Sequence, residues 1–205
     1  MTRPVLLGRS GLAPTGARRV PRQAGRALTP GEVGMARQIF GTSVAYGRVK
    51  VHRGRFLPGS GDNAMTPFGE MHFPESGYRD DFSQASDAAK IWFMHEMVHV
   101  WQHQLGRCVM CQGAVLALKG GYGPESHAYD YDPDLDQGKT FSEFNMEQQG
   151  DLIAHYFDAR YLVSNPSVQH PQRVALLPFY EAVLADFLLN PADARLLPKS
   201  TRVWR

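Results

Sequence analysis

The amino-acid sequence predicts an α+β fold in which a small three-stranded sheet is followed by helices. Alternation of apolar and polar residues, which is typical of strands, occurs only before residue 75. After residue 86 the apolar residues recur with the period of helices, and typical helix-end residues punctuate them. The 205 residues are 43% hydrophobic and 20% charged, which is ordinary for one globular domain with a core.

The first predicted element is a helix over residues 29–40. Thr29 can cap its N-terminus, Pro30 suits the first helical position, and Glu32 completes a capping box. Gly41 follows the last apolar residues and is a typical C-terminal stop. The sequence therefore predicts a short helix in front of the sheet.

Three strands are predicted next. Residues 46–52, with the sequence YGRVKVH, alternate between apolar and polar side chains. Residues 64–66 and 70–73 flank the turn sequence Pro67-Phe68-Gly69 and are expected to pair as a hairpin.

Helices are predicted for the remainder. The first covers about residues 87–105, is capped by Ser83 or Ser86, and ends at Gly106. A long loop is expected to follow it over residues 108–139.

Two more helices are predicted after this loop. Thr140 and Glu143 form a second capping box, which is expected to open a helix that extends to about Leu162. A last amphipathic helix is expected over about residues 172–189.

Both ends of the chain are expected to lie outside the domain. Residues 1–27 are predicted to be a flexible Arg-rich leader and residues 191–205 a tail, so that the domain spans residues 28–190. Residues 1–28 hold six arginines and no Asp or Glu, and the rest of the chain carries a net charge of −4. The overall charge of +2 therefore reflects the leader, and no nucleic-acid partner is expected.

A metal-binding motif is predicted in the helix over residues 87–105. Its apolar run WFMHEMVHVW contains His95, Glu96 and His99. Residues four apart lie on one helical face, so the two imidazoles can bind one zinc ion at about 2.0–2.1 Å. Glu96 can then act as general base on a water molecule. The alternative is that three polar side chains are buried for packing alone, where each would need a partner.

A catalytic zinc site needs a third protein ligand. His103 follows His99 by four residues, but it lies about 12 Å along the helix from His95, too far to share one ion. Gln102 occupies the glycine position of the H-E-x-x-H-x-x-G-x-x-H class, which excludes that class.

A better third ligand is predicted in the helix that begins near Thr140. Glu147 and Asp151 are four residues apart and share one helical face. Glu147 can complete the site, and Asp151 can accept the free N–H of a ligand histidine and fix its tautomer. Glu143 is the rival candidate for the third ligand.

Other polar residues give weaker signals. Cys108 and Cys111 form a lone C-x-x-C, which lacks the second pair of a structural zinc site and is expected to be a free thiol pair or a local disulfide. A reaction at a carbonyl needs a donor for the oxyanion. The candidates are His155 and Tyr156, together with His127 and Tyr129.

The two helical motifs resemble those of gluzincin-type zinc metallopeptidases. The resemblance implies a minimal zincin-like domain with zinc bound by His95, His99 and Glu147. It also implies Glu96 as the catalytic base and Asp151 behind a ligand histidine. The expected activity is hydrolysis of a peptide bond by Glu-assisted attack of a zinc-bound water. Zincins usually bind substrate along a sheet edge, for which residues 70–73 are expected here.

A closer likeness covers about residues 28–160. The segments LTPGEVGMARQIFG, RVKVH, AMTPFGEMHFP, HEMVHVWQHQ and GKTFSEFNMEQQGDLIAHYF are similar to a bacterial peptidase-like family of Vgr-related proteins, associated with contractile injection systems. This likeness implies a type VI secretion effector or accessory protein. The implied partners are a peptide or protein substrate and a VgrG-like spike protein.

The expected location is the bacterial cytoplasm, with export by a contractile secretion system. The apolar stretch Val5-Leu6-Leu7 is too short for a classical signal peptide. No apolar run reaches the roughly 20 residues of a membrane span. The alternative function is a zinc-stabilised, non-catalytic binding or loading module for a spike protein.

Overall fold

The computed structural model describes residues 24–57, 61–122, 127–162 and 169–202. They form a mixed α+β structure, as predicted, with three strands and seven α-helices within these ranges. The elements in chain order are β1 (Arg26–Ala27), α1 (Pro30–Phe40), β2 (Lys50–Arg53), β3 (Met71–Phe73), α2 (Asp87–Gln104), α3 (Val109–Leu118), α4 (Met146–Tyr161), α5 (His170–Ala175), α6 (Leu177–Val183) and α7 (Ala185–Leu189).

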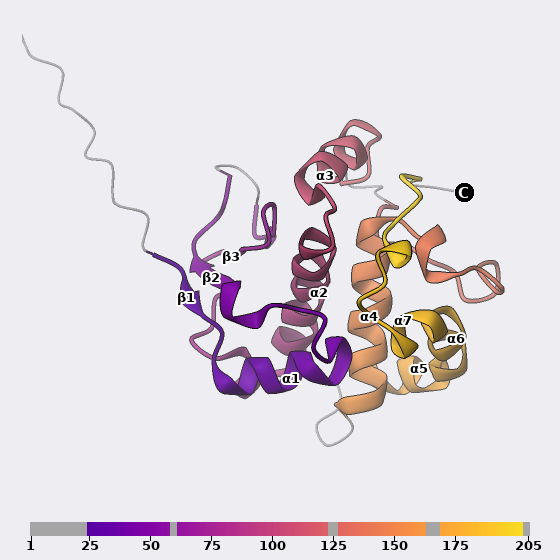
Figure 1. Ribbon diagram of the computed structural model, residues 1–205, viewed down its shortest axis with the longest axis horizontal. Coiled ribbons are helices and arrows are strands. Elements are labelled where there is room, and N and C mark those ends of the chain that lie inside the picture. Colours follow the sequence, from indigo (N-terminus) through magenta and orange to yellow (C-terminus); the bar gives the residue numbers. More distant parts are fainter. Residues whose placement is uncertain (1–23, 58–60, 123–126, 163–168, 203–205) are drawn as a thin grey trace, which may run out of the picture.

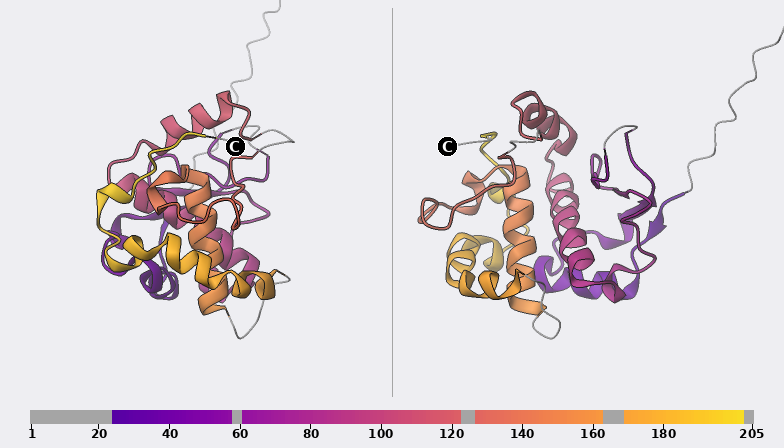
Figure 2. Two further views of the ribbon diagram at one scale, coloured as in Figure 1. Left: turned by 90° about the vertical axis from the view of Figure 1, so that its right-hand side faces the viewer. Right: turned by 180° about the vertical axis from the view of Figure 1, so that it is seen from behind.

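Helices α2 and α4 lie side by side at the centre of the molecule (Figures 1 and 2). The sheet lies on one side of this pair, and α5, α6 and α7 lie on the other. Every residue of α2 from Phe93 to Gln102 is buried. A helix that is enclosed on all sides is a core helix, which explains why apolar residues occur on every face of α2.

The sheet has the order β1-β2-β3. β1 pairs antiparallel with β2, and β2 pairs parallel with β3. The predicted hairpin is present as one antiparallel bridge between Met65 and His72. The strand predicted from Tyr46 begins only at Lys50, because Tyr46–Arg48 form a 3₁₀ turn.

The capping box predicted at Thr29 and Glu32 is confirmed. The Glu32 carboxylate is fully buried and also accepts hydrogen bonds from the Arg26 guanidinium (2.7 and 2.8 Å) and from the backbone N–H of Phe82 (2.9 Å). Arg26 therefore belongs to the folded part, although it was placed at the end of the leader. Residues 1–23 of that leader lie outside the described residues.

Helix α3 occupies part of the segment that was expected to be a loop, so that prediction is wrong. The Sγ atom of Cys108 accepts a hydrogen bond from the backbone N–H of Cys111, and the two cysteines form a disulfide. The helix is hard to recognise in the sequence because its N-cap is a cysteine and Gly113 lies in its middle.

The helix predicted from Thr140 begins only at Met146. The Thr140 capping box is present, but it closes a single 3₁₀ turn, Phe141–Glu143. Asn145 caps α4 instead, because its side-chain oxygen accepts hydrogen bonds from the first backbone N–H groups of the helix, including that of Glu147. Glu147 therefore lies in the first turn of α4.

The last predicted helix is divided into α5, α6 and α7, with breaks at Leu176 and Leu184. Pro178 contributes to the first break, because it has no N–H to continue the hydrogen-bond ladder of α5.

The segment after residue 190, predicted to be a tail, packs against the two central helices. Trp101 Nε1 donates to the carbonyl oxygen of Pro191 (2.6 Å), and Gln149 Nε2 donates to that of Leu196 (2.9 Å). The folded part of the chain therefore extends past residue 190.

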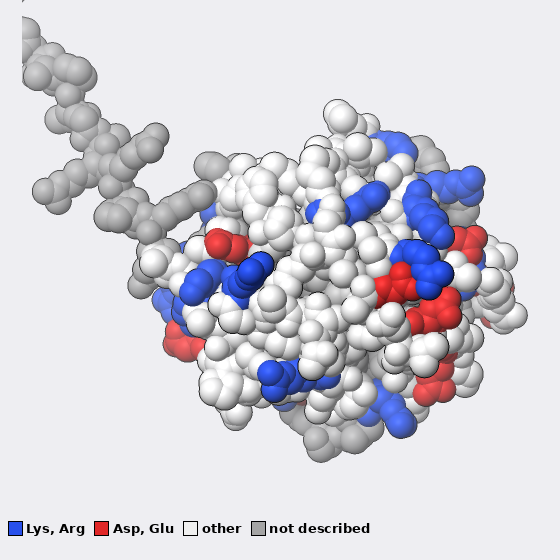
Figure 3. Space-filling view, in the orientation of Figure 1, with Lys and Arg blue, Asp and Glu red and all other residues white. Residues whose placement is uncertain are grey.

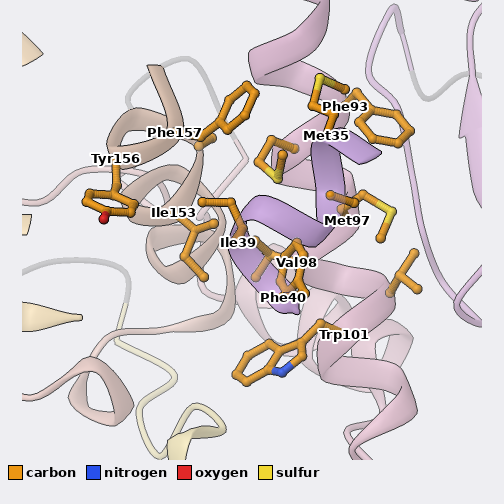
Figure 4. Close-up of a cluster of buried hydrophobic side chains, with 14 of the residues drawn as sticks. Met35, Ile39, Phe40, Phe93, Met97, Val98, Trp101, Ile153, Tyr156 and Phe157 are labelled. Carbon is orange, nitrogen blue, oxygen red and sulfur yellow. The ribbon is translucent and has the colours of Figure 1, made fainter. Parts of the chain in front are cut away.

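One apolar cluster joins α1, α2 and α4 (Figure 4). It includes Met35, Ile39 and Phe40 from α1, Phe93, Met97, Val98 and Trp101 from α2, and Ile153 and Phe157 from α4. This packing fixes α2 and α4 relative to one another, which matters because the predicted metal ligands come from both helices.

Two further properties concern the helices as possible membrane spans and the charges on the surface. Within the described ranges, no helix has both the length and the apolar character needed to cross a bilayer. Basic and acidic side chains lie next to one another on the face drawn in Figure 3.

Candidate metal centre

His95, His99 and Glu147 converge between α2 and α4. The Nε2 atoms of the two histidines are 3.1 Å apart, and each lies 3.1 Å from Oε2 of Glu147. All three residues are buried. The structure therefore brings together the three residues that the sequence predicted as ligands.

The imidazole protons point away from this triangle. His95 Nδ1 lies 2.8 Å from the carboxylate of Asp151, which accepts, so Nδ1 carries the proton. His99 Nδ1 lies 2.9 Å from Oε1 of Gln102, whose amide nitrogen donates to the carbonyl of Met146. This bond fixes Oε1 as an acceptor, so His99 also carries its proton on Nδ1. Both Nε2 atoms therefore direct lone pairs toward each other and toward a carboxylate oxygen.

Three acceptors that face one another need a positive charge between them. A tetrahedral zinc ion with bonds of about 2.0–2.1 Å separates its ligand atoms by roughly 3.3 Å, close to the 3.1 Å separations of this triangle. Two imidazole nitrogens and one carboxylate oxygen are also a donor set that zinc uses with a fourth position left open. The residues present therefore fit zinc.

The surroundings of this triangle also favour protons on the two histidines. Burial lowers the pKa of His95, but hydrogen bonds with Asp151 and Glu147 outweigh burial and raise this pKa well above its usual value. Burial alone would raise the pKa of Glu147, but the two histidines hold it far below its usual value. A zinc ion would have to displace protons from the histidines, so its affinity for this site is expected to fall as the pH falls.

Glu96 is held in place by the sheet. Thr66 Oγ1 donates a 2.6 Å hydrogen bond to Glu96 Oε2, and both residues are buried. Thr66 follows Met65, whose backbone N–H and carbonyl both bond to His72 of β3. The sheet therefore orients the carboxylate that follows the first histidine in the motif.

Gly150 allows α4 to approach the first histidine closely. A Cβ atom at this position would lie only 2.5–2.8 Å from three atoms of the His95 ring. Contacts that short do not occur. The His95 ring therefore lies in the space that the Cβ atom of any residue other than glycine at position 150 would need.

Comparisons with known proteins identify relatives of this fold. The chain is 34% identical to the effector domain of Pseudomonas aeruginosa VgrG2b, with a TM-score of 0.58 over 80% of this chain and 83% of that domain. The chain belongs to the family of the VgrG2b effector domain. It is also 38% identical over 138 residues to the type VI secretion system spike protein VgrG2b of that bacterium. These residues are 66% of this chain but 13% of the spike protein. No protein-family model matches the chain.

Two residues that were weighed as ligands lie outside the metal centre of this VgrG2b-type domain. Glu143, the rival third ligand, is exposed, and its carboxylate accepts hydrogen bonds from the backbone and hydroxyl of Thr140 (2.8 and 2.9 Å). His103 lies against Gly69, where an added Cβ atom would approach the His103 ring to 2.5 Å.

Two tyrosines of the VgrG2b-type domain approach the metal centre. The Tyr122 hydroxyl donates to Oε1 of Glu147, the oxygen outside the ligand triangle. The ring centre of Tyr129 lies 5.9 Å from that of His95. Burial and the nearby carboxylates of Glu147 and Glu96 raise the pKa of Tyr129 above its usual value. Its hydroxyl therefore stays protonated and can donate a hydrogen bond.

The residues predicted as oxyanion donors lie farther along α4. His155 comes two turns, or about 12 Å, after Glu147. Its Nδ1 atom lies 2.7 Å from the Tyr131 hydroxyl, and burial lowers its pKa to about 4. Tyr156 contacts the ring of Tyr161 and points away from α2 in Figure 4. The geometry therefore favours neither residue for this role.

Sequence reasoning missed four residues of this centre. Gln102 had a local signal, because it follows His99 by three residues on the same helical face. A glycine inside a helix, such as Gly150, often has a packing reason. Thr66 and Tyr122 had no local signal, because each contacts a partner that is distant in the chain.

Proposed function

We propose that this chain is a zinc-dependent metallopeptidase of minimal gluzincin type that acts as a type VI secretion effector or accessory protein. The proposal is carried by the buried triangle of His95, His99 and Glu147, with Glu96 adjacent in α2. A structural zinc site usually has four protein ligands, whereas the residues that the structure describes supply three here. A zinc ion held by three residues would have one coordination position left for water. Glu96 next to that position favours hydrolysis.

In the proposed reaction a water molecule attacks the carbonyl carbon of a peptide bond. Zinc bound by the three ligands supplies a Lewis acid that polarises the carbonyl and makes water more acidic. Glu96 accepts a proton from the attacking water as the C–O bond forms, and donates it to the amide nitrogen as the C–N bond breaks. The products are a carboxylic acid and an amine, and Glu96 is again a carboxylate.

Tyr129 is the donor that we assign to the developing oxyanion. The charge on the carbonyl oxygen needs a preorganised donor close to the metal. The Tyr129 ring lies beside His95, and its hydroxyl has no hydrogen-bond partner among the described residues. Tyr122, the neighbouring tyrosine, already donates to Glu147.

β3 is the edge strand of the sheet, as expected for residues 70–73, but an extended substrate would pair with residues 64–66 instead. Met65 covers the outer side of β3 at His72. Because backbone groups alternate in direction along a strand, those of Ala64 and Thr66 face away from β3. A peptide added there would lie next to the Thr66 side chain that holds Glu96.

The secretion role in this proposal rests on the relative. VgrG2b is a type VI secretion system spike protein, and this chain matches its effector domain. We therefore propose a peptide or protein substrate, a VgrG-like spike as partner, and export from the bacterial cytoplasm by the contractile system.

A zinc-stabilised binding or loading module for the spike is the second candidate function. It is favoured by α3, on which Met110, Val115 and Leu118 expose 38%, 38% and 89% of their surface. Neighbouring exposed apolar side chains are typical of surfaces that contact another protein. In such a module zinc would only stabilise the fold, and Glu96 would have no chemical role.

Zinc content is the first test of the metal centre. After dialysis, wild-type protein is expected to retain about one tightly bound zinc, because three ligands converge on one ion. Glu147→Ala should lose most of it. Glu143→Ala, which removes an exposed carboxylate outside the centre, is the control and should retain it. A folded, zinc-supplied wild type that binds none would refute the peptidase proposal.

Thr66→Val is expected to lower kcat about 10-fold, which corresponds to about 1.4 kcal/mol. Valine keeps the shape of threonine but removes a hydrogen bond to a charged group, which typically contributes about 1.5–3 kcal/mol. Thr66→Ser keeps the hydroxyl and should retain most of the activity. Peptide cleavage and zinc content should be measured together, and equal kcat for both variants would show that Thr66 does not position Glu96.

A further inference from the structure

A second group of metal-binding side chains lies on the sheet. It consists of His52, Glu70 and His72, and each residue offers one ligand atom within 4.8 Å of the other two. His72 is buried, and the other two residues are partly exposed. None of the three belongs to the metal centre between α2 and α4.

Strand pairing places the three side chains on one face of the sheet. His52 of β2 and His72 of β3 are direct partners in the parallel pair, so their side chains are neighbours. Glu70 precedes His72 by two residues, and residues two apart in extended chain point to the same face. Val51 and Met71 alternate with them and are buried in the core. The group therefore lies on the face opposite the core.

The contacts within this group are close. His52 Nε2 lies 2.7 Å from Glu70 Oε2, and the rings of His52 and His72 stack with centres 4.3 Å apart. The Phe56 ring packs edge-on against His72. The His52 ring lies over Gly25, where a Cβ atom would approach it to 2.5 Å. The three side chains therefore lie close together on this face of the sheet.

We propose that His52, Glu70 and His72 form a second site for a divalent transition-metal ion such as zinc. Two imidazole nitrogens and a carboxylate oxygen suit such an ion. The two rings are within 7° of parallel, so both must turn about the Cβ–Cγ bond to direct lone pairs at one ion. This torsion is broad in histidine, so the turn costs little. A simple ion pair with Glu70 would need one histidine, whereas the sheet supplies two.

An ion at this site would join β2 to β3. Because β3 holds Met65 through His72, the ion would also stiffen the segment whose Thr66 contacts Glu96. Two of the ligands are partly exposed, with 19% of the His52 side chain and 46% of the Glu70 side chain accessible. The second ion is therefore bound more weakly than the one between α2 and α4.

Zinc titration followed by calorimetry and native mass spectrometry tests this proposal. The wild type is expected to bind a second ion after the first, and His99→Ala should lose only the tight one. Glu70→Gln and His72→Phe should weaken the second ion at least about 10-fold, since even outer-shell partners of a metal contribute 10–100-fold. Glu70→Gln preserves the size of a partly exposed side chain, so a loss in this variant does not arise from unfolding.

His127→Phe is the matched control, because His127 also pairs with a carboxylate, that of Asp130, at 2.8 Å. This variant should retain both ions. A wild type that binds only the ion abolished by His99→Ala would overturn the proposal. A second ion that is unaffected by both Glu70→Gln and His72→Phe would also overturn it. Either result leaves the proposed peptidase centre untouched, so the two proposals can fail separately.

Discussion

Glu96→Gln is expected to lower kcat by about 10²–10⁴-fold, the usual contribution of a general acid–base group, while zinc binding stays unchanged. Glutamine has nearly the same shape as glutamate, and its amide oxygen can still accept the Thr66 hydrogen bond. It cannot take a proton from water and return it to the leaving amine. Glu96 lies outside the triangle of His95, His99 and Glu147, so the metal should stay bound.

This effect is measured as kcat on an unfolded protein substrate, with zinc content determined on the same sample. Glu143→Gln is the matched control, because it makes the same change at an exposed position outside the centre. A Glu96→Gln protein with normal turnover would show that another group takes the proton. A zinc-loaded wild type that cleaves none of a broad set of substrates would favour the binding module.

Gly150→Ala is expected to reduce zinc affinity by about 100-fold or more, at or beyond the upper limit for loss of a metal's outer-shell partner. The added methyl group would overlap the His95 ring, with contacts of 2.5–2.8 Å. Either the ring leaves the ligand triangle or α4 moves away from α2. In an ordinary helix interior the same change stabilises by about 1 kcal/mol. Here overpacking of about 1–3 kcal/mol opposes that gain.

Gly113→Ala in α3 provides the control. A Cβ atom at this position would lie 3.6 Å or more from its nearest neighbours, an ordinary contact, so the change should stabilise the protein and keep the zinc. Urea unfolding measures the stability of both variants, and zinc titration measures their zinc affinity. Normal zinc affinity in Gly150→Ala would mean that α2 and α4 can separate at no cost to the site, and the close approach would then lose its role.

The grouping of the candidate metal ligands could be predicted because its signals are local. His95 and His99 share a helical face through their spacing alone, and the same holds for Glu147 and Asp151. The pairing of the two helices could be predicted because neither motif supplies three ligands by itself. The capping box at Thr29 could likewise be read directly, because its members are three residues apart.

The remaining parts of the centre depend on contacts between distant segments. Thr66 contacts Glu96 across 30 residues, and Tyr122 contacts Glu147 across 25. The edge strand itself was predicted, since β3 is last in the sheet, but the pattern did not show that Met65 bridges its outer side at His72. The start of α4 was misplaced because Thr140 and Asn145 both have capping geometry, and only the packed structure selects Asn145 for the helix.

The hydrogen bonds of the last segment bear on the order in which the molecule folds. Gln149 donates to the carbonyl of Leu196 and accepts from Gln102, which in turn holds the ring of His99. The candidate ligand His99 is therefore connected to the Leu196 carbonyl through the hydrogen-bonded side chains of Gln102 and Gln149. When the ribosome has added Asp151, every side chain of the candidate centre has been made. The segment around Leu196, which orders that centre, has not. The contact between Gln149 and Leu196 spans 47 residues, so it cannot form before Leu196 has been made. The candidate metal centre thus reaches its final order only after the chain has been made as far as Leu196, well beyond its last candidate ligand, Glu147.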